Sequence, residues 1–268
     1  MKKQTKKTAI ILFAVAAIVL MVATIIVKAP GEHGAIGEVM KDAVLHESDK
    51  ISLFGLMEVN PGLIAAFTVT GIFLVLALVI RIFVIPRFKL IPGKLQAALE
   101  LAVGYFDNLA KSNSPHRNKF LGGYVFVAGA YIFVGTVFEL FGLQAVTVHG
   151  HSISLPAPLA DINGAIMMGV LSYLVILSGG IAENKLKGVG KTLKEFSLPI
   201  SMSFRLFGAL LSGALVTEMV YHYLALSYGL PVVVGVLFTL LHALIQAYVL
   251  TMLTALFYGE VSEPPHKK

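Results

Sequence analysis

A small set of ionisable side chains lies within the apolar stretches of this sequence, and Arg205 is the most unusual of them. It falls in the run PISMSFRLFGALLSG, residues 199–213, which continues as apolar sequence to about Tyr228. An arginine at the centre of a bilayer costs about 2.5–3.5 kcal/mol, so it is retained where it faces a partner or a water-filled path. The alternative is an arginine near a helix end that reaches back to the membrane surface.

The remaining polar groups within the apolar stretches are carboxylates, imidazoles and amides. Carboxylates and imidazoles can exchange protons near neutral pH, whereas an arginine stays protonated. These groups therefore predict an ion path, and the alternative for each is a structural hydrogen bond between spans. The candidates are Glu139, Asp161, Asn163, Glu218, His222, His242 and Gln246.

The depth of two of these groups follows from a predicted turn at residues 229–231. Glu218 and His242 each lie twelve residues from Leu230, which is about 18 Å along a helix. His222 lies one helical turn from Glu218 on the same face. We expect an aqueous half-path that passes these groups from outside, with Glu139 and Asp161 at its mouth and Arg205 deeper.

Arg205 would block a direct leak and favour the charged form of a carboxyl that passes it. The stretch around Arg205 contains no carboxylate. The carboxyl must therefore come from another span or from another subunit.

The elements that position these residues are predicted to be membrane-spanning helices. The chain has 268 residues, of which 57% are hydrophobic and 13% are charged, whereas soluble domains carry about 25% charged residues. We therefore predict an all-α, polytopic membrane protein. The absence of cysteine excludes disulfides and thiolate metal sites. The formal charge of +6 is concentrated in short loops, which indicates topology rather than nucleic-acid binding.

Six spans account for the apolar runs and place both termini on the cytoplasmic side by the positive-inside rule. The first run, ending at Val27, could also be a signal peptide, but we favour a retained span. The domain division is 1–27 (first span or signal sequence), 28–62 (outside polar loop) and 63–268 (core). The predicted spans are 8–27, 63–85, 121–141, 161–181, 199–228 and 231–258.

A segment after the second predicted span indicates an amphipathic helix. Pro92 and Gly93 interrupt the chain, and apolar residues then recur at helical spacing.

A basic loop, Lys185–Lys194, is predicted after the fourth span. The histidines lack the spacing of a metal site, so we expect no metal and no cofactor.

Four separate motifs resemble one known family, subunit a of the F-type ATP synthase membrane sector. The run around Arg205 is similar to the family pattern Pro-x-Ser-x-x-x-Arg-Leu-Phe-Gly-Asn. A second motif comprises Pro92, Gly93, Lys94, Gln96 and Glu100, and a third comprises Pro158, Asp161 and Asn163. The fourth is the stretch His242–Thr254, which contains Gln246. The matches follow one another in order from about Leu63 to Glu260.

The resemblance implies a function that the residues alone leave open. It implies an ion-conducting stator subunit with two offset half-channels, in which Arg205 discharges a carboxylate of the rotating c-subunit ring. It further implies b-type peripheral stalk subunits as partners, H⁺ or Na⁺ as the ion, and no ATP chemistry on this chain. The expected location is an energy-coupling membrane, the bacterial inner membrane.

Three positions depart from the family pattern. Ala209 replaces the usual Asn, and Ala214 and Thr239 stand where ionisable channel residues are common. Our hypothesis is that Glu218 and His242 replace the missing channel pair, and that Gln246 neighbours Arg205. The alternative function is a secondary transporter in which Arg205 binds an anionic substrate. An intramembrane protease is disfavoured because no Ser/His or paired-Asp set lies at membrane depth.

Overall fold

The computed structural model describes residues 15, 19, 50–53, 57–148, 150, 152–222 and 230–264 of the chain, which are predominantly helical. Four helical stretches in this part are long and apolar enough to cross a membrane: Pro61–Arg87, Lys119–Phe141, Ile162–Lys194 and Gly235–Val261. The predicted all-α, multi-pass class is confirmed. The first predicted span, apart from Val15 and Val19, lies outside the described residues, as does Gly229 of the predicted turn at 229–231. The other two residues of that turn, Leu230 and Pro231, begin helix α8 (Leu230–Val261).

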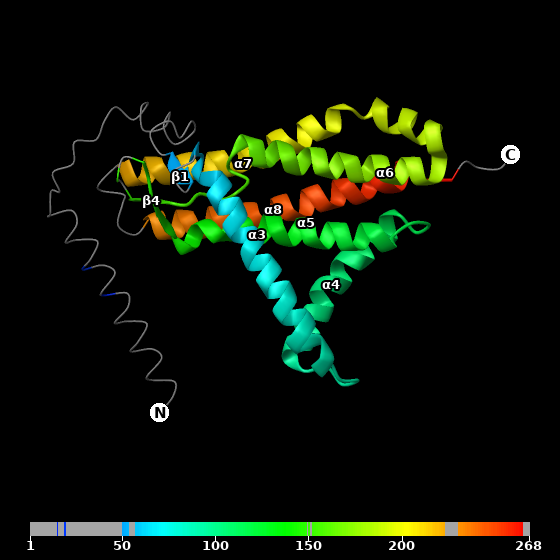
Figure 1. Cartoon of the computed structure of the whole chain (residues 1–268), viewed down its shortest axis with the longest axis horizontal. Helices are drawn as coiled ribbons and strands as arrows, with labels where there is room; N and C mark the ends of the chain where they lie inside the picture. Colours follow the sequence, from blue (N-terminus) through cyan, green and yellow to red (C-terminus); the bar gives the residue numbers. More distant parts are fainter. Residues whose placement is uncertain are drawn as a thin grey trace.

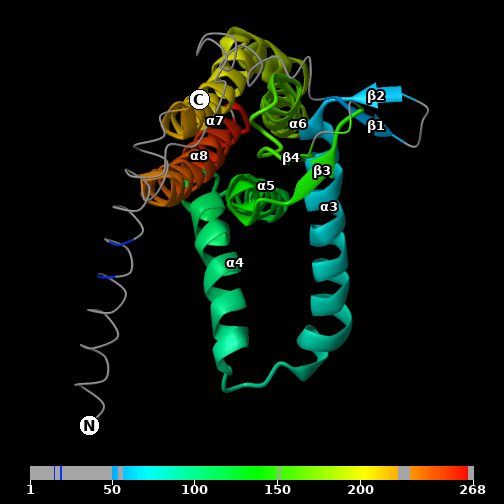
Figure 2. The ribbon, with the colours of Figure 1, turned by 90° about the vertical axis from the view of Figure 1, so that its left-hand side faces the viewer.

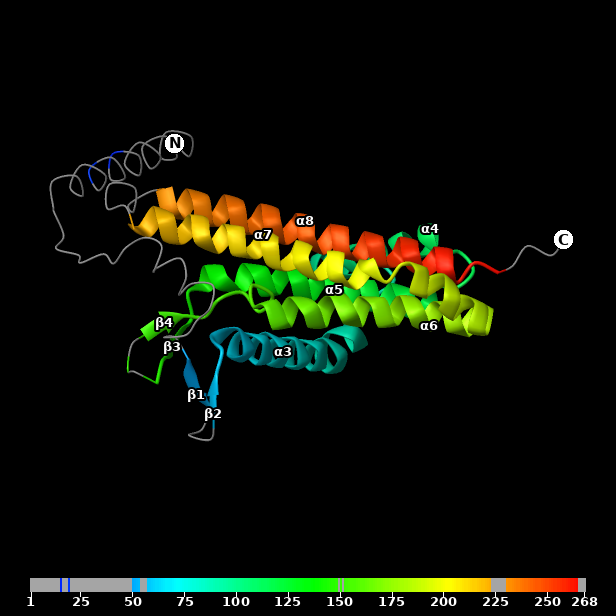
Figure 3. The same cartoon turned by 90° about the horizontal axis from the view of Figure 1, so that it is seen from above.

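Four helices lie side by side and form the main bundle (Figures 1 and 3): α5 (Lys119–Phe138), α6 (Ile162–Lys194), α7 (Ser197–His222) and α8 (Leu230–Val261). Helix α8 packs along α5, and α7 packs along α6. Figure 3 shows α7 and α8 as one layer on the side of the bundle opposite α3. Small residues allow close packing, which is the usual contact between helices in lipid. At Gly179, a Cβ atom would lie 2.5 Å from the ring of the buried Tyr258.

Two further helices form a pair that leads away from this bundle (Figure 2). They are α3 (Pro61–Val79), continued by the π turn η1 (Ile80–Val84) and the 3₁₀ turn η2 (Ile85–Arg87), and α4 (Lys94–Asn113). The buried residues of α3 all lie in its first half, and the one buried residue of α4 is Ala110, near its end. Each helix therefore contacts the bundle at one end only. The amphipathic helix that was predicted to follow Pro92 and Gly93 is confirmed by α4, which begins at Lys94.

Two short antiparallel hairpins were not anticipated from the sequence. Strand β1 (Ile51–Leu53) pairs with β2 (Met57–Val59), and β3 (Gln144–Val146) pairs with β4 (Ser152–Ser154). The second hairpin connects α5 to α6. Both lie in segments that were expected to be irregular loops, where three-residue strands leave no recognisable periodicity.

The predicted basic loop Lys185–Lys194 is wrong, because α6 continues as helix to Lys194. A break at Lys185, with φ 49° and ψ −129°, turns the second part of the helix back on the first. The fold-back brings Gly188 against the backbone of Gly180, so closely that Gly188 leaves no room for a Cβ atom and Gly180 leaves little. Thr192 is buried beside them and donates a hydrogen bond to the Gly188 carbonyl at 3.0 Å.

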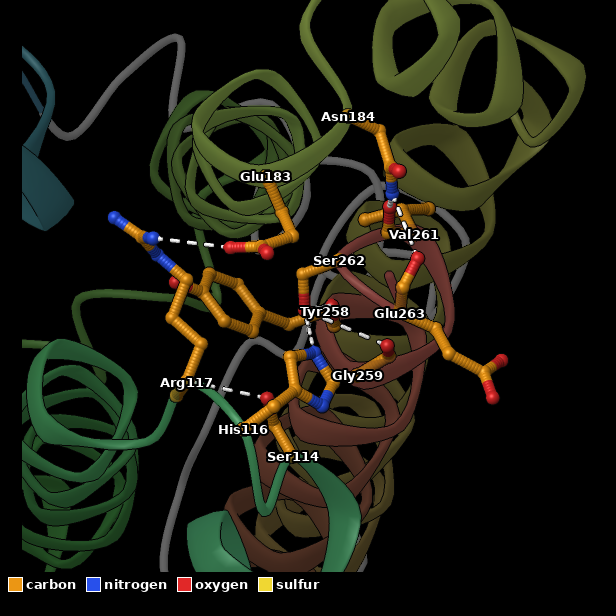
Figure 4. A network of polar contacts seen from close by, with 10 residues as sticks. All are labelled: Ser114, His116, Arg117, Glu183, Asn184, Tyr258, Gly259, Val261, Ser262 and Glu263. Carbon is orange, nitrogen blue, oxygen red and sulfur yellow. Dashed lines mark hydrogen bonds and ion pairs between the residues drawn. The ribbon is translucent and has the colours of Figure 1, made fainter. Parts of the chain in front are cut away.

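Hydrogen bonds fix the last turn of α8 to two neighbouring segments, and we call this group the C-terminal latch (Figure 4). Asn184 of α6 donates to the carbonyls of Val261 and Glu263, each at 2.9 Å. The Ser262 hydroxyl lies 2.9 Å from His116 Nε2 and donates to the Tyr258 carbonyl at 2.5 Å. Since the hydroxyl proton is already used, Nε2 of His116 must be the donor to Ser262. Arg117 and Glu183 add an ion pair at 3.5 Å.

Candidate functional site

Arg205 lies on the exposed face of α7, eight residues beyond the start of the helix at Ser197. Ser201, Phe204 and Gly208 share this exposed face, because residues three and four apart are neighbours on a helix. Met202 and Leu206 are buried against the bundle. The local sequence thus divides α7 into a packed apolar side and a side that carries the guanidinium outward.

Arg205 makes no hydrogen bond or ion pair within the described part of the chain, and its guanidinium offers five N–H donors. The predicted neighbour Gln246 is buried on α8, at 6% exposure. No hydrogen bond between Gln246 and Arg205 occurs among the described residues, so their contact stays a prediction. The arrangement leaves the charge of Arg205 available to a group that approaches α7 from outside the bundle.

A small cavity lies between α5, α7 and α8, and we call it the bundle cavity. Its volume is about 10 Å³, which is close to the minimum that holds one water molecule. The turn η3 (Glu139–Phe141) follows α5 and contributes Glu139, while α8 contributes Thr239 and His242. The remaining lining residues are Thr136, Ala209, Leu210, Gly213 and Phe238. A carboxylate, a hydroxyl and an imidazole therefore meet around a space of water size.

His242 is held in one defined orientation in this cavity. Its Nδ1 atom lies 2.7 Å from the Phe238 carbonyl, which can only accept, so Nδ1 is the donor. The imidazole also stacks on the Phe238 ring, with centroids 5.8 Å apart and planes 17° apart. Nε2 is therefore the ring nitrogen that carries no hydrogen in the neutral tautomer and can accept a hydrogen bond. A fixed tautomer with one available nitrogen is the arrangement that a proton relay requires.

The predicted pairing of Glu218 with His242 lies outside the described side chains. The backbone of Glu218 lies in α7, five residues beyond Gly213, which lines the bundle cavity. The backbone of His222 ends the same helix. Both assignments stay predictions. The bundle cavity brings together Glu139 and His242, which the sequence analysis placed on one ion path without pairing them.

Asp161 and Asn163 line a different cavity, between α3, α5 and α6. Asp161 caps α6: its Oδ1 accepts from the backbone nitrogen and the side-chain Nδ2 of Asn163, both at 3.3 Å. The capping role considered for Asp161 is thereby confirmed. Its predicted place at the mouth of the ion path stays a prediction. Among the described residues, no group of three His, Asp or Glu side chains is arranged to hold a metal ion.

The sequence matches one family model and is similar to several proteins that share one name. The family model described as ATP synthase A chain matches residues 65–259. A protein of Cereibacter sphaeroides (strain ATCC 17025) named ATP synthase subunit a is 25% identical over 192 residues, covering 67% of this chain and 74% of the relative. A protein of the same name from Actinobacillus pleuropneumoniae serotype 3 (strain JL03) is 27% identical over 227 residues, covering 70% and 86%.

Proposed function

This chain belongs to the ATP synthase A chain family, and we propose that it conducts ions past a rotating ring of carboxylates as the stator of an F-type ATP synthase. Its coarser role, as a multi-pass component of the membrane sector of that complex, follows from the family and the spanning helices. The family favours this function over a secondary transporter, which the sequence alone also allowed.

The exposure of Arg205 on the α7–α8 layer is the observation that carries the proposal. A buried arginine would need a partner within the chain, whereas this one is exposed on α7, which lies on the side of the bundle opposite α3 (Figure 3). A c-subunit carboxyl that passes Arg205 is held in its charged form and releases its ion. Because the guanidinium cannot itself give up a proton, it also prevents ions from crossing without the ring.

The bundle cavity supplies the proposed entry to this face. An incoming proton passes between the Glu139 carboxylate and Nε2 of His242, by way of the single water that the cavity accommodates. Glu218 and His222 extend the same path along α7 toward the end of the helix. In this assignment Glu139 and His242 compensate for the non-ionisable Ala214 and Thr239.

The assembly around the chain is proposed on the same basis. The c-subunit ring faces α7 and α8, and b-type peripheral stalk subunits hold the chain still. Chain residues 63–268 form the conducting core, both termini are cytoplasmic, and the bilayer is the bacterial inner membrane. The chain performs no ATP chemistry of its own, and the translocated ion is H⁺ or Na⁺.

The test is ATP-driven ion pumping in inverted vesicles that contain the whole complex. Arg205→Ala should abolish pumping, because the ring carboxyl is then no longer discharged, while the complex stays assembled. Phe204→Ala is the matched control, since Phe204 is 63% exposed on the same face and carries no charge. Normal pumping by an assembled Arg205→Ala complex would refute the proposal.

A further inference from the structure

The cavity between α3, α5 and α6 shares no lining residue with the bundle cavity, and we propose that it binds one phospholipid with an ammonium headgroup, of the phosphatidylethanolamine type. We call it the lateral cavity. Its volume is about 540 Å³, within the range of about 300–1,000 Å³ that is typical of small-molecule sites. In this assignment an acyl chain lies between the helices and the ammonium meets Asp161.

The shape of the lateral cavity follows from the way α3 leaves the bundle. At its first turn α3 touches α6 closely: a Cβ atom on Gly62 would lie 2.8 Å from Cβ of Asp161. Beyond that contact α3 diverges from α5 and α6 (Figure 2). The small residues Gly62, Ala66 and Thr70 recur every fourth position along its lining face. The result is a wedge that is closed at one end and open sideways to the bilayer.

The length of the wedge suits an acyl chain. On α6 its lining extends from Asp161 to Leu171, which is about 15 Å along the helix axis. The walls are formed by apolar side chains such as Leu63, Val127 and Met167. Methionine adapts its shape to a flexible neighbour, and Met168 adds a second such side chain. The wall chemistry therefore matches a hydrocarbon chain over most of this length.

The charge at the closed end selects the headgroup. Asp161 is the one charged side chain among the described residues that line the cavity, and the lining contains no lysine or arginine. Oδ1 of Asp161 accepts both bonds from Asn163, which leaves Oδ2 to receive a donor from a ligand. An ammonium supplies that donor, whereas an anionic headgroup would be repelled. Because Asp161 precedes a spanning helix, it lies at headgroup depth.

The expected selectivity is modest and depends on the headgroup. A lipid chain gains little by moving from the bilayer to an apolar wall, since both are equally apolar. The ion pair with Asp161 is exposed to the interface, which corresponds to an enrichment of about two- to fivefold over the bulk lipid. The preference for phosphatidylethanolamine should therefore depend on the charge of residue 161. The amount of lipid bound in the lateral cavity should depend on the free space between the helices.

The experiment uses the whole complex in vesicles of equal parts phosphatidylethanolamine and phosphatidylglycerol. The complex is extracted in detergent, and the lipids it retains are counted by mass spectrometry. Since other subunits also retain lipid, the measure is the difference between each variant and the wild type. Asp161→Asn keeps a good N-cap and removes the charge, so the enrichment of phosphatidylethanolamine should fall to the bulk ratio.

A second variant tests occupancy separately. Ala66→Phe fills the wedge and should release about one lipid per complex, whereas Leu74→Phe, on an exposed part of α3 outside the lining, should release none. The proposal is overturned if Asp161→Asn retains the enrichment, if the wild type prefers phosphatidylglycerol, or if Ala66→Phe retains as much lipid as Leu74→Phe.

Discussion

The C-terminal latch and the bundle cavity use polar side chains in opposite ways. In the latch, Asn184 and Ser262 are bonded to backbone carbonyls whose positions they fix. In the bundle cavity, His242 is oriented by one nitrogen and keeps the other available. Hydrogen bonds therefore fix backbone geometry at one end of α8, whereas in the middle of the helix a hydrogen bond orients a side chain for the proton exchange that we propose. Variants of the bundle cavity should therefore change pumping, and variants of the latch should change stability.

The largest effect should follow loss of the proton-exchanging groups of the bundle cavity. Glu139→Gln and His242→Gln should each reduce ATP-driven pumping at least about tenfold, because each removes a general acid–base group. The stability of the complex should hardly change. Pumping in inverted vesicles, normalised to the amount of assembled complex, is the measurement. Leu241→Ala is the control, since Leu241 is an exposed side chain of α8 outside the cavity lining.

A double variant sharpens this result. If Glu139 and His242 act in one path, the double variant should pump no worse than the more impaired single variant. Glu218→Ala belongs in the same series, because it tests the predicted extension of the path. If Glu139→Gln, Glu218→Ala and His242→Gln all pump normally, the proposed entry path is wrong.

The next largest effect should be a loss of stability at the latch end of α8. Gly259 lies directly against the Asn113 carbonyl, which leaves no room for a Cβ atom. Gly259→Ala should destabilise the complex by about 1–3 kcal/mol, seen as a lower melting temperature. Gly123→Ala is the control, since open space surrounds Gly123 and alanine favours a helix. Equal melting temperatures for the two variants would contradict the close packing.

A smaller effect should follow loss of one latch hydrogen bond. Ser262→Ala removes the acceptor of His116 and should cost about 0.5–1.5 kcal/mol, while pumping per assembled complex stays unchanged. His116→Ala should cost a similar amount, and the two losses should not add. If Ser262→Ala or His116→Ala lost much of its pumping at unchanged stability, the latch would take part in conduction, and the contrast with the bundle cavity would be wrong.

The smallest effect should appear at the break in α6. Lys185 has a φ of 49°, which a side chain disfavours and glycine adopts readily. Lys185→Gly should stabilise the complex by about 0.5 kcal/mol, since the relief of strain exceeds the entropic cost of glycine by a small amount. Lys187→Gly, within the helical part that follows, should instead destabilise it by about 1 kcal/mol. Thermal unfolding of both variants distinguishes the two positions.

Hydropathy predicted four of the six spans, because each apolar run must cover the thickness of the bilayer. The fifth predicted span, 199–228, falls on α7, which is not among these four in the described residues, and it stays a prediction. The predicted span Leu63–Ile85 became Pro61–Arg87, and Leu121–Phe141 became Lys119–Phe141. The approach of Glu139 to His242 could not be predicted, since it depends on how α5 packs against α8 over about a hundred residues of chain. The fold-back of α6 did leave a signal, in Gly180 and Gly188, but glycines in a basic segment are also typical of a loop.

The latch has a mechanical consequence for the proposed function. A ring that turns against α7 and α8 exerts a sideways force on them at every step, and each charge that crosses carries about 2.3 kcal/mol per 100 mV. The latch joins the end of α8 to the turn between α4 and α5 and to α6, through bonds worth together a few kcal/mol. Torque on α8 is thereby transmitted to the helices on the far side of the bundle, so the load is borne by the whole stator.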